Sequence, residues 1–244
     1  MPATSAKLYI GTSGWSYGDW RGRFYPVDVP RKKWLPWYAA RFASSEINGS
    51  FYRTPSEDAV RAWREQTPRD FRFAWKASQF ITHWKRLGES SANSVDLMVS
   101  RLKILGPKCG PVLFQLPARF EADGERLENF LHMLPKEYSY AFEFRHESWY
   151  AKEILRLLEA NSVALCFSDH HHAPAPWTVT ASHVYVRGHG PGGRYKGNYS
   201  HQTLRLWARR IRRWQRDRLD TYIYFDNDQK SAAPEDAKKL LELL

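Results

Sequence analysis

Cysteine is scarce in this chain, which has two in 244 residues, Cys109 and Cys166. Two thiols cannot form a disulfide framework or a four-ligand zinc site, so we expect a reducing, cytoplasmic location. Long apolar runs are absent as well, since no stretch approaches the roughly 20 residues that span a bilayer. The short polar start does not resemble a signal peptide. These absences predict a protein without a membrane partner.

Acidic residues are too few to balance the basic ones: 26 Asp and Glu stand against 37 Lys and Arg, a net charge of +11. A positive field attracts nucleic acid and phosphorylated molecules, although charge also serves solubility. Aromatic residues are abundant, with 11 Trp, 13 Tyr and 13 Phe. Some of these rings are expected to line a ligand cleft, and plain core packing is the alternative.

Short runs rich in β-branched and aromatic residues recur about every 30 residues, and most are followed by a helical pattern. This is the size of a βα unit, so the pattern predicts a TIM-type (β/α)8 barrel of parallel strands, one domain over residues 1–244 after a flexible start at 1–7. Residues 168–182 carry two prolines and no helical period, so the sixth unit should lack its helix. The expected strands are Leu8–Gly11, Ser45–Ile47, Arg72–Ala77, Pro111–Gln115, Tyr140–Phe144, Val163–Phe167, His183–Arg187 and Thr221–Phe225.

Side chains alternate across a strand, which decides which of them reach the barrel axis at the carboxyl ends. If the apolar residues face the helices, five strands each direct a polar side chain into one small cavity at the barrel axis. A structural network of paired charges is the alternative to a functional site. The inward set is Glu46, Asn48, Lys76, Gln115, Glu143, Arg145 and Arg187, with Asp169, Asp226 and Asn227 at the ends of the sixth and eighth strands.

Seven segments along almost the whole chain resemble the YecE-like family, also called domain of unknown function 72. They are Gly11-Thr-Ser-Gly-Trp15, Glu46-Ile-Asn-Gly-Ser-Phe-Tyr52, Phe71-Arg-Phe-Ala-Trp-Lys76 with Thr82-His83, Phe114-Gln-Leu-Pro117, Phe142-Glu-Phe-Arg-His-Glu-Ser-Trp149, Tyr185-Val-Arg-Gly-His-Gly190 and Tyr224-Phe-Asp-Asn-Asp228. The resemblance implies a TIM-type barrel without an established activity, whose fold has been compared with endonuclease IV and xylose isomerase relatives. This chain departs from the family pattern at Gly188 and at Asp226-Asn227.

A metal site is not favoured by the residues between the acidic ones. Glu46, Glu143 and Asp169 offer oxygen ligands, yet the intervening strands supply Lys76 and Gln115, and a lysine repels a cation. The consecutive histidines at positions 170–172 cannot all point at one ion. We therefore expect no cofactor, with a divalent metal as the alternative.

Metal-free acid/base chemistry suits the same residues. Glu46, Glu143 and Asp169 are the candidate acid, base or ligand groups, and Lys76 and Arg145 the candidate charge stabilisers. A carboxylate pair also hydrolyses glycosides, and a desolvated lysine also forms Schiff bases. The sequence does not distinguish these reactions.

Glycines after the seventh strand predict a phosphate site, because their backbone N–H groups can approach an anion. The leading hypothesis is an enzyme acting on a phosphate-bearing substrate, a nucleic acid or nucleotide. The alternatives are a noncatalytic nucleic-acid-binding module and a carbohydrate-active enzyme. The candidate substrate-binding residues are Trp15, Asn48, Tyr52, Gln115, His146, Trp149, Arg187, His189, Gly190, Tyr195, Tyr199 and Asn227.

The densest charge run lies in residues 202–218, where arginines stand opposite an apolar helical stripe. On a barrel this side faces solvent at the outer wall. We expect a solvated face, with nonspecific binding of polyanions as the alternative. The sequence does not define an oligomeric state.

Overall fold

The computed structural model describes residues 6–244. Residues 1–5 of the expected flexible start therefore lie outside the described residues. Lys7 is already held against the last strand, because its backbone N donates to Asp220 Oδ1 at 2.7 Å and its carbonyl accepts from Thr221 N at 2.9 Å.

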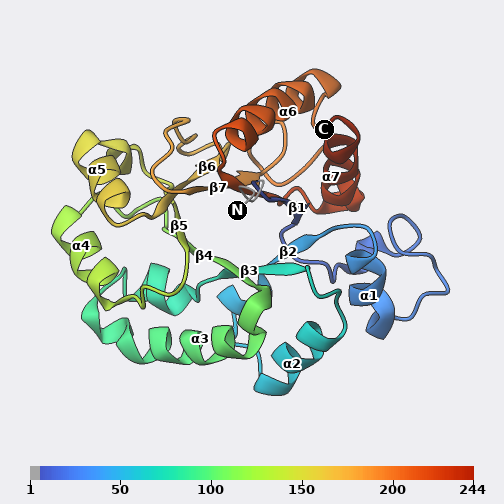
Figure 1. The fold of residues 1–244 in the computed structure, drawn as a ribbon, viewed down its shortest axis with the longest axis horizontal. Helices are drawn as coiled ribbons and strands as arrows, with labels where there is room; N and C mark the ends of the chain where they lie inside the picture. Colours follow the sequence, from blue (N-terminus) through green and yellow to red (C-terminus); the bar gives the residue numbers. More distant parts are fainter. Residues whose placement is uncertain (1–5) are drawn as a thin grey trace, which may run out of the picture.

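Eight parallel strands lie at the middle of the molecule, in the order β1-β8-β7-β6-β5-β4-β3-β2 (Figure 1). The two strands at the ends of this order, β1 and β2, meet at one bridge between Ser13 and Glu46, which makes a nearly closed barrel. The predicted TIM-type fold is confirmed. The strands are β1 Leu8–Thr12, β2 Ser44–Ile47, β3 Arg72–Lys76, β4 Cys109–Gln115, β5 Tyr140–Glu143, β6 Ala164–Ser168, β7 His183–Gly188 and β8 Asp220–Phe225.

A tyrosine side chain completes the junction of β1 and β2. The hydroxyl of Tyr38 accepts from Thr12 N at 2.8 Å and donates to Ser44 O at 3.0 Å, so it stands between two backbone groups that do not pair directly. Gly11 allows this close approach, because a Cβ there would lie 1.9 Å from Ser44 O.

Helices surround the strands on the outside (Figure 1). Between β6 and β7 residues 169–182 form no helix, as the sequence predicts. Among the helices of residues 6–244, none combines the length and apolar character needed to cross a lipid bilayer. The α-helices are α1 Trp34–Ala39, α2 Glu57–Glu65, α3 Ala92–Leu105, α4 Gly124–Met133, α5 Lys152–Ala160, α6 His201–Arg216 and α7 Ala232–Glu242.

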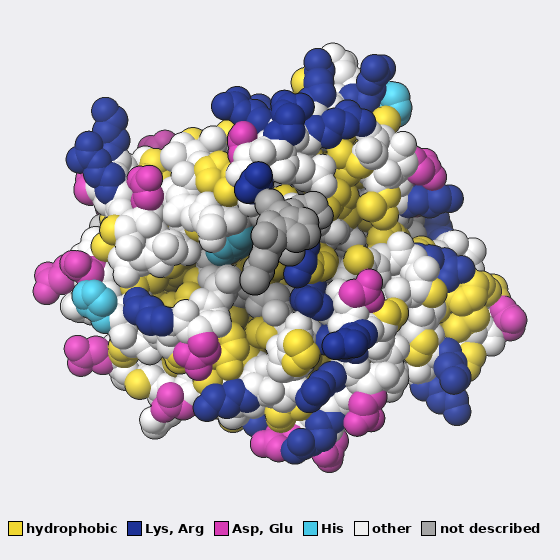
Figure 2. Space-filling model, viewed as in Figure 1, with side chains coloured by type: hydrophobic (Ala, Val, Ile, Leu, Met, Phe, Trp, Pro, Cys, Tyr) yellow, Lys and Arg dark blue, Asp and Glu magenta, His cyan; other side chains and the backbone are white. Residues whose placement is uncertain are grey.

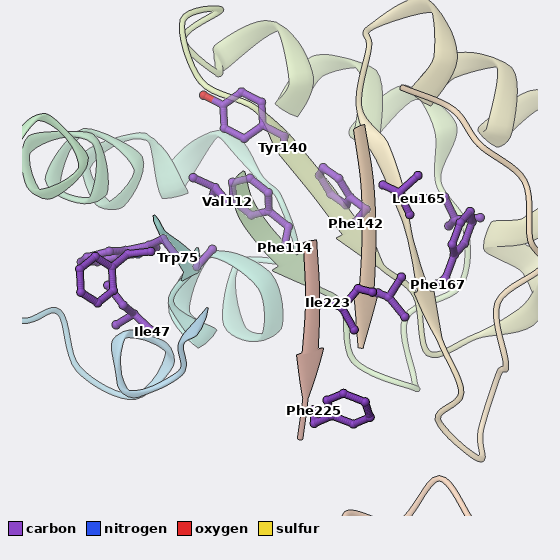
Figure 3. Close-up of a cluster of buried hydrophobic side chains, with 14 of the residues drawn as sticks. Ile47, Trp75, Val112, Phe114, Tyr140, Phe142, Leu165, Phe167, Ile223 and Phe225 are labelled. Carbon is purple, nitrogen blue, oxygen red and sulfur yellow. The ribbon is translucent and has the colours of Figure 1, made fainter. Parts of the chain in front are cut away.

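The main hydrophobic core lies between the strands and the helices, where outward-facing side chains such as Ile47, Trp75, Phe114 and Phe142 pack (Figure 3). A second, smaller cluster fills the barrel interior. It consists of Ala74, Leu113, Ala141, Ala164, Cys166, Tyr185 and Tyr224. Side chains two positions further along these strands face the same way, so this apolar layer forms the floor of the layer above it.

Candidate functional site

The layer above the apolar floor is polar. Because strand residues two apart share a face, Lys76 follows Ala74, Gln115 follows Leu113, Glu143 follows Ala141, Arg187 follows Tyr185 and Asp226 follows Tyr224. All five residues are buried, as is Glu46 at the end of β2. Except for Asn48, which lines a separate pocket, the inward polar residues expected from strand alternation thus lie in one layer, which we call the cup.

Arg187 is the centre of the cup. Its guanidinium is fully buried and contacts three carboxylates: Glu143 Oε2 at 2.6 Å, Asp226 Oδ2 at 2.8 Å and Glu46 Oε1 at 2.9 Å. Ser13 Oγ also accepts from it, at 3.1 Å. Although burial opposes its charge, Asp226, Glu46 and Glu143 raise the pKa of Arg187 well above its usual value. Arg187 therefore organises the carboxylates through its terminal nitrogens, while its buried Nε has no hydrogen-bond partner within residues 6–244.

Glu46 and Glu143 are both fully buried and engaged on both oxygens. Glu46 accepts from Ser13 and Arg187 on one oxygen and from Tyr185 Oη at 2.7 Å on the other. Glu143 Oε1 accepts from Arg145 at 2.6 Å and from Ser168 at 3.1 Å. Burial alone would raise the pKa of Glu143, but Arg145 and Arg187 hold it well below its usual range.

His189 contacts two arginines, Arg145 and Arg187. Its Nε2 is 3.1 Å from Arg145 Nη2 and 3.2 Å from Arg187 Nη1. A guanidinium can only donate, so both arginines direct N–H groups at Nε2, while Nδ1 lies 3.5 Å from Asp169 Oδ1. Arg145 also donates to Tyr195 Oη at 2.9 Å, so Tyr195 closes this side of the cup.

Lys76 differs from every other charged group of the cup. Its side chain is 7% exposed, yet within residues 6–244 its ammonium makes no hydrogen bond or ion pair. It lies 4.4 Å from the ring centroid of Phe51. Burial, and next the charge of Arg187, lower the pKa of Lys76 to about 8, against the attraction of Asp226, Glu46 and Glu143. A nearly buried cation that has a ring face but no anionic partner is costly, so an anionic group bound at this amine would be stabilised.

A pocket of about 310 Å³ opens beside the cup, at the carboxyl ends of β1 and β2. Trp15, Tyr17, Tyr52 and Trp63 give it aromatic walls, and Tyr52 is 70% exposed. Asn48 lies in the same lining, and its buried Oδ1 has no hydrogen-bond partner within residues 6–244. This pocket can accept a flat ring and offers an unused polar group to it.

The glycine loop after β7 does not present its early N–H groups to an anion. His189 N donates to Asp169 Oδ1 at 2.7 Å, Gly190 N donates to Tyr199 Oη at 2.8 Å, and Gly193 N donates to Gly190 O at 2.8 Å. Since these donors already have acceptors in the protein, the expected phosphate cradle is occupied by the fold itself.

Four other candidate residues are held by contacts within the fold. Trp149 is fully buried, stacks on Phe144 and donates to Phe120 O. His146 Nδ1 accepts from Ser148 N at the start of a short helical turn. The remaining two are Tyr199, which packs on Trp207 and bonds to Asp169, and Asn227, which donates to Asp236 Oδ2 at 2.8 Å.

Several cup residues were not singled out as binding or catalytic groups from the sequence. Asp226, not Asn227, points at the cup, and Ser13, Ser168 and Tyr185 complete its hydrogen bonds. Strand alternation identifies two of these residues, since Ser168 and Asp226 each lie two residues after a member of the interior cluster, Cys166 and Tyr224. Within residues 6–244, no three His, Cys, Asp or Glu side chains are arranged to hold a metal ion.

Comparison with known proteins agrees with this architecture. A family model described as protein of unknown function DUF72 matches residues 9–244. The UPF0759 protein YunF of Bacillus subtilis (strain 168) is 28% identical over 271 residues, covering 97% of this chain and 94% of YunF. The UPF0759 protein YecE of Escherichia coli (strain K12) is 34% identical over 146 residues, 59% of this chain and 51% of YecE.

Solved structures match over the full barrel. A DUF72 family protein from Thermotoga maritima MSB8 is 26% identical with a TM-score of 0.87, covering 97% of this chain and 98% of that one. A second, from Enterococcus faecalis V583, is 20% identical with a TM-score of 0.83, covering 97% and 95%. The likeness extends from the first strand to the last helix and shows that the barrel is shared.

Proposed function

Because the chain belongs to the DUF72 family of unknown function, as its motifs predict, we propose an activity from the geometry of its own site. The protein is an enzyme that acts on a phosphate-bearing substrate, a nucleotide or a nucleic-acid strand, at the carboxyl ends of the barrel strands. The observation that carries this proposal is the Lys76 ammonium, nearly buried and without an ion pair within residues 6–244. A phosphate oxygen would supply the missing partner.

The cup divides into a scaffold and a reactive edge. Arg187 with Glu46 and Glu143 forms the scaffold, since all three are fully buried and bonded to one another. Lys76 and Asp226 form the edge, because both retain some exposure. With a pKa near 8, Lys76 can give a proton to a leaving group near neutral pH, and Asp226 is the neighbouring carboxylate that can take one from water.

The aromatic pocket gives the substrate a second feature. Its rings lie beside the cup, and a pocket of about 310 Å³ accommodates one flat ring. A nucleobase stacked on Tyr52 or Trp15 would leave its phosphate to reach toward Lys76. Base stacking on aromatic side chains contributes about 1–3 kcal/mol, which is enough to select a nucleotide over a simple phosphate ester.

Calorimetric titration with nucleoside monophosphates and with inorganic phosphate tests the proposal. Lys76→Met should abolish binding of both, while Lys33→Met, an exposed lysine in the turn before α1, should leave both unchanged. Tyr52→Ala should weaken the nucleotide about tenfold or more and leave inorganic phosphate unaffected. Binding of neutral sugars, with no binding of phosphate, would favour the carbohydrate-active alternative.

The noncatalytic nucleic-acid-binding module is the second candidate, and the saturation of Glu46 and Glu143 favours it. Neither carboxylate has an oxygen free for a substrate. Assay of phosphate release or strand cleavage under saturating ligand separates the two. Turnover that Lys76→Met and Asp226→Asn both remove supports the enzyme, and binding without turnover supports the module.

A further inference from the structure

A strongly basic surface lies on helix α6, on the outer wall of the barrel. Helix α6 carries six arginines, no lysine and no acidic residue in sixteen positions. In Figure 2 dark blue side chains gather over this helix at the top of the view. Its apolar side, which includes Leu204, Trp207 and Ile211, is buried against the barrel, so the arginines face outward.

Three of these arginines are explained by contacts within the chain. Arg210 covers the ring of Trp177 at 4.2 Å, Arg212 donates to Leu243 O at 2.5 Å, and Arg213 faces Asp217 at 3.8 Å. Such contacts account for an arginine as packing, as a helix end contact or as an exposed ion pair.

The other three, Arg205, Arg209 and Arg216, make no hydrogen bond, ion pair or ring contact within residues 6–244, and all are exposed. The spacing of the arginines also lowers the stability of the helix, because Arg205 and Arg209 are four residues apart, as are Arg209 and Arg213. Like charges at this spacing destabilise a helix by about 0.2–0.5 kcal/mol per pair. The helix dipole favours cations only in the last turn, which leaves Arg205 and Arg209 unexplained.

A cavity of about 570 Å³ runs along the same side of α6. His201, Gln202, Arg205, Arg209, Arg212 and Leu243 line it, with Ala208, and none of these side chains is acidic. From Arg205 to Arg216 the stripe extends about 16 Å along the helix axis, given a rise of about 1.5 Å per residue. This length matches about five phosphates of one nucleic-acid strand, which rise by about 3.4 Å each.

We propose that the stripe of Arg205, Arg209 and Arg216, with the cavity beside it, binds the phosphate backbone of a nucleic acid. Guanidinium groups hold phosphate oxygens in a fork, which fits the choice of arginine over lysine at every basic position of α6. An anionic membrane fits less well, because the apolar side of the helix is already packed against the barrel and cannot enter lipid. The surface acts independently of the cup and does not require the activity proposed above.

Fluorescence anisotropy with a labelled 20-base-pair DNA duplex, and with single-stranded RNA of the same length, tests this surface at 50 mM salt. The triple variant R205Q/R209Q/R216Q should weaken binding tenfold or more and reduce the salt slope on the duplex by about 2.7. A matched variant, K32Q/K136Q/K152Q, removes the same charge from exposed lysines elsewhere and should change affinity less than threefold.

Further variants separate this surface from the cup. R205K/R209K/R216K keeps the charge but loses the fork, and should bind with intermediate affinity. Lys76→Met should leave duplex binding unchanged, whereas the arginine variant should leave mononucleotide binding unchanged. Equal weakening by the two triple variants would overturn the proposal, as would no binding at 50 mM salt. Stronger binding to phosphatidylserine vesicles than to either nucleic acid would overturn it as well.

Discussion

Arginine serves two opposite purposes in the cup and on α6. In the cup, Arg187 is fully buried and held by three carboxylates at 2.6–2.9 Å. On α6, Arg205, Arg209 and Arg216 are exposed and lack any carboxylate partner within residues 6–244. A cation whose terminal nitrogens are saturated by the fold has a structural role first, whereas a cation that the fold leaves unpaired can be paired by a ligand. Lys76 lies in the cup but also lacks a carboxylate partner within residues 6–244, and its ammonium contacts only the ring of Phe51.

The largest effect is expected from removing the saturated cation. Arg187→Met leaves Glu46, Glu143 and Asp226 buried around an apolar side chain, so the free energy of unfolding should fall by about 3–5 kcal/mol or more. Arg209→Met should change it by less than about 0.5 kcal/mol. Urea denaturation of both variants measures the difference. Similar losses for the two would end the distinction between a saturated and an unsatisfied arginine.

Low pH should reduce the stability that the cup contributes and should not change the contribution of α6. The folded-state pKa of Glu143 lies well below its unfolded value because of Arg145 and Arg187, against the effect of burial. The stability that this carboxylate contributes is therefore complete above pH 4.5 and is lost as the pH falls below that value toward its folded pKa. Unfolding free energies between pH 6 and 3 should fall more steeply in the wild type than in Glu143→Gln. A pH dependence equal in both would contradict this assignment.

The pH dependence of stability that Lys76 causes should have the opposite sign. Its pKa falls from 10.5 to about 8 on folding. The charged amine therefore opposes folding fully below pH 8, and this cost disappears as the pH rises to about 10.5. Lys76→Met should thus be more stable than the wild type by about 1–3 kcal/mol at pH 7, with the gap closing above pH 10. A destabilised variant at pH 7 would show that Lys76 has a partner in the folded protein.

The smallest effect is expected on α6. Arg209→Glu converts two repulsive spacings, to Arg205 and to Arg213, into attractive ones and should stabilise the protein by roughly 0.3–1 kcal/mol. Arg209→Gln, which only removes the repulsion, should give about half of this. Thermal unfolding at low salt measures both, and the gain should shrink at 1 M salt because the charges are screened.

The sequence predicts the barrel and the first members of the cup for one physical reason. Where an apolar neighbour packs on the helices, as Ile47, Phe142 and Val186 do, alternation identifies the adjacent side chain of the strand as inward. It does so for Glu46, Glu143 and Arg187. At the eighth strand the inward residues are themselves aromatic, and Tyr224 lies inside the barrel beside Tyr185. The parity of Asp226 and Asn227 is therefore hidden in the sequence.

Loop residues are less predictable because their partners come from distant segments. Trp149 and Tyr199 follow strands, as mouth residues do, yet Phe120 and Asp169 satisfy them inside the fold. The same holds for the N–H groups of the glycine loop, which Asp169 and Tyr199 occupy. Lys76 shows the opposite case, since its lack of a partner becomes visible only when all of its neighbours are placed.

The junction between β1 and β2, which the Tyr38 side chain completes, bears on how evenly the barrel is protected from solvent. Every other pair of neighbouring strands is joined by a run of backbone pairs, whereas β1 and β2 share the single bridge of Ser13 and Glu46, next to which the Tyr38 hydroxyl stands between Thr12 and Ser44. Amide hydrogens along this edge should exchange with solvent sooner than those of β7 and β8, because fewer backbone bonds must open. The loops that follow β1 and β2 carry Trp15 and Tyr52, so the aromatic pocket is built on the edge of the barrel that has the fewest backbone bonds.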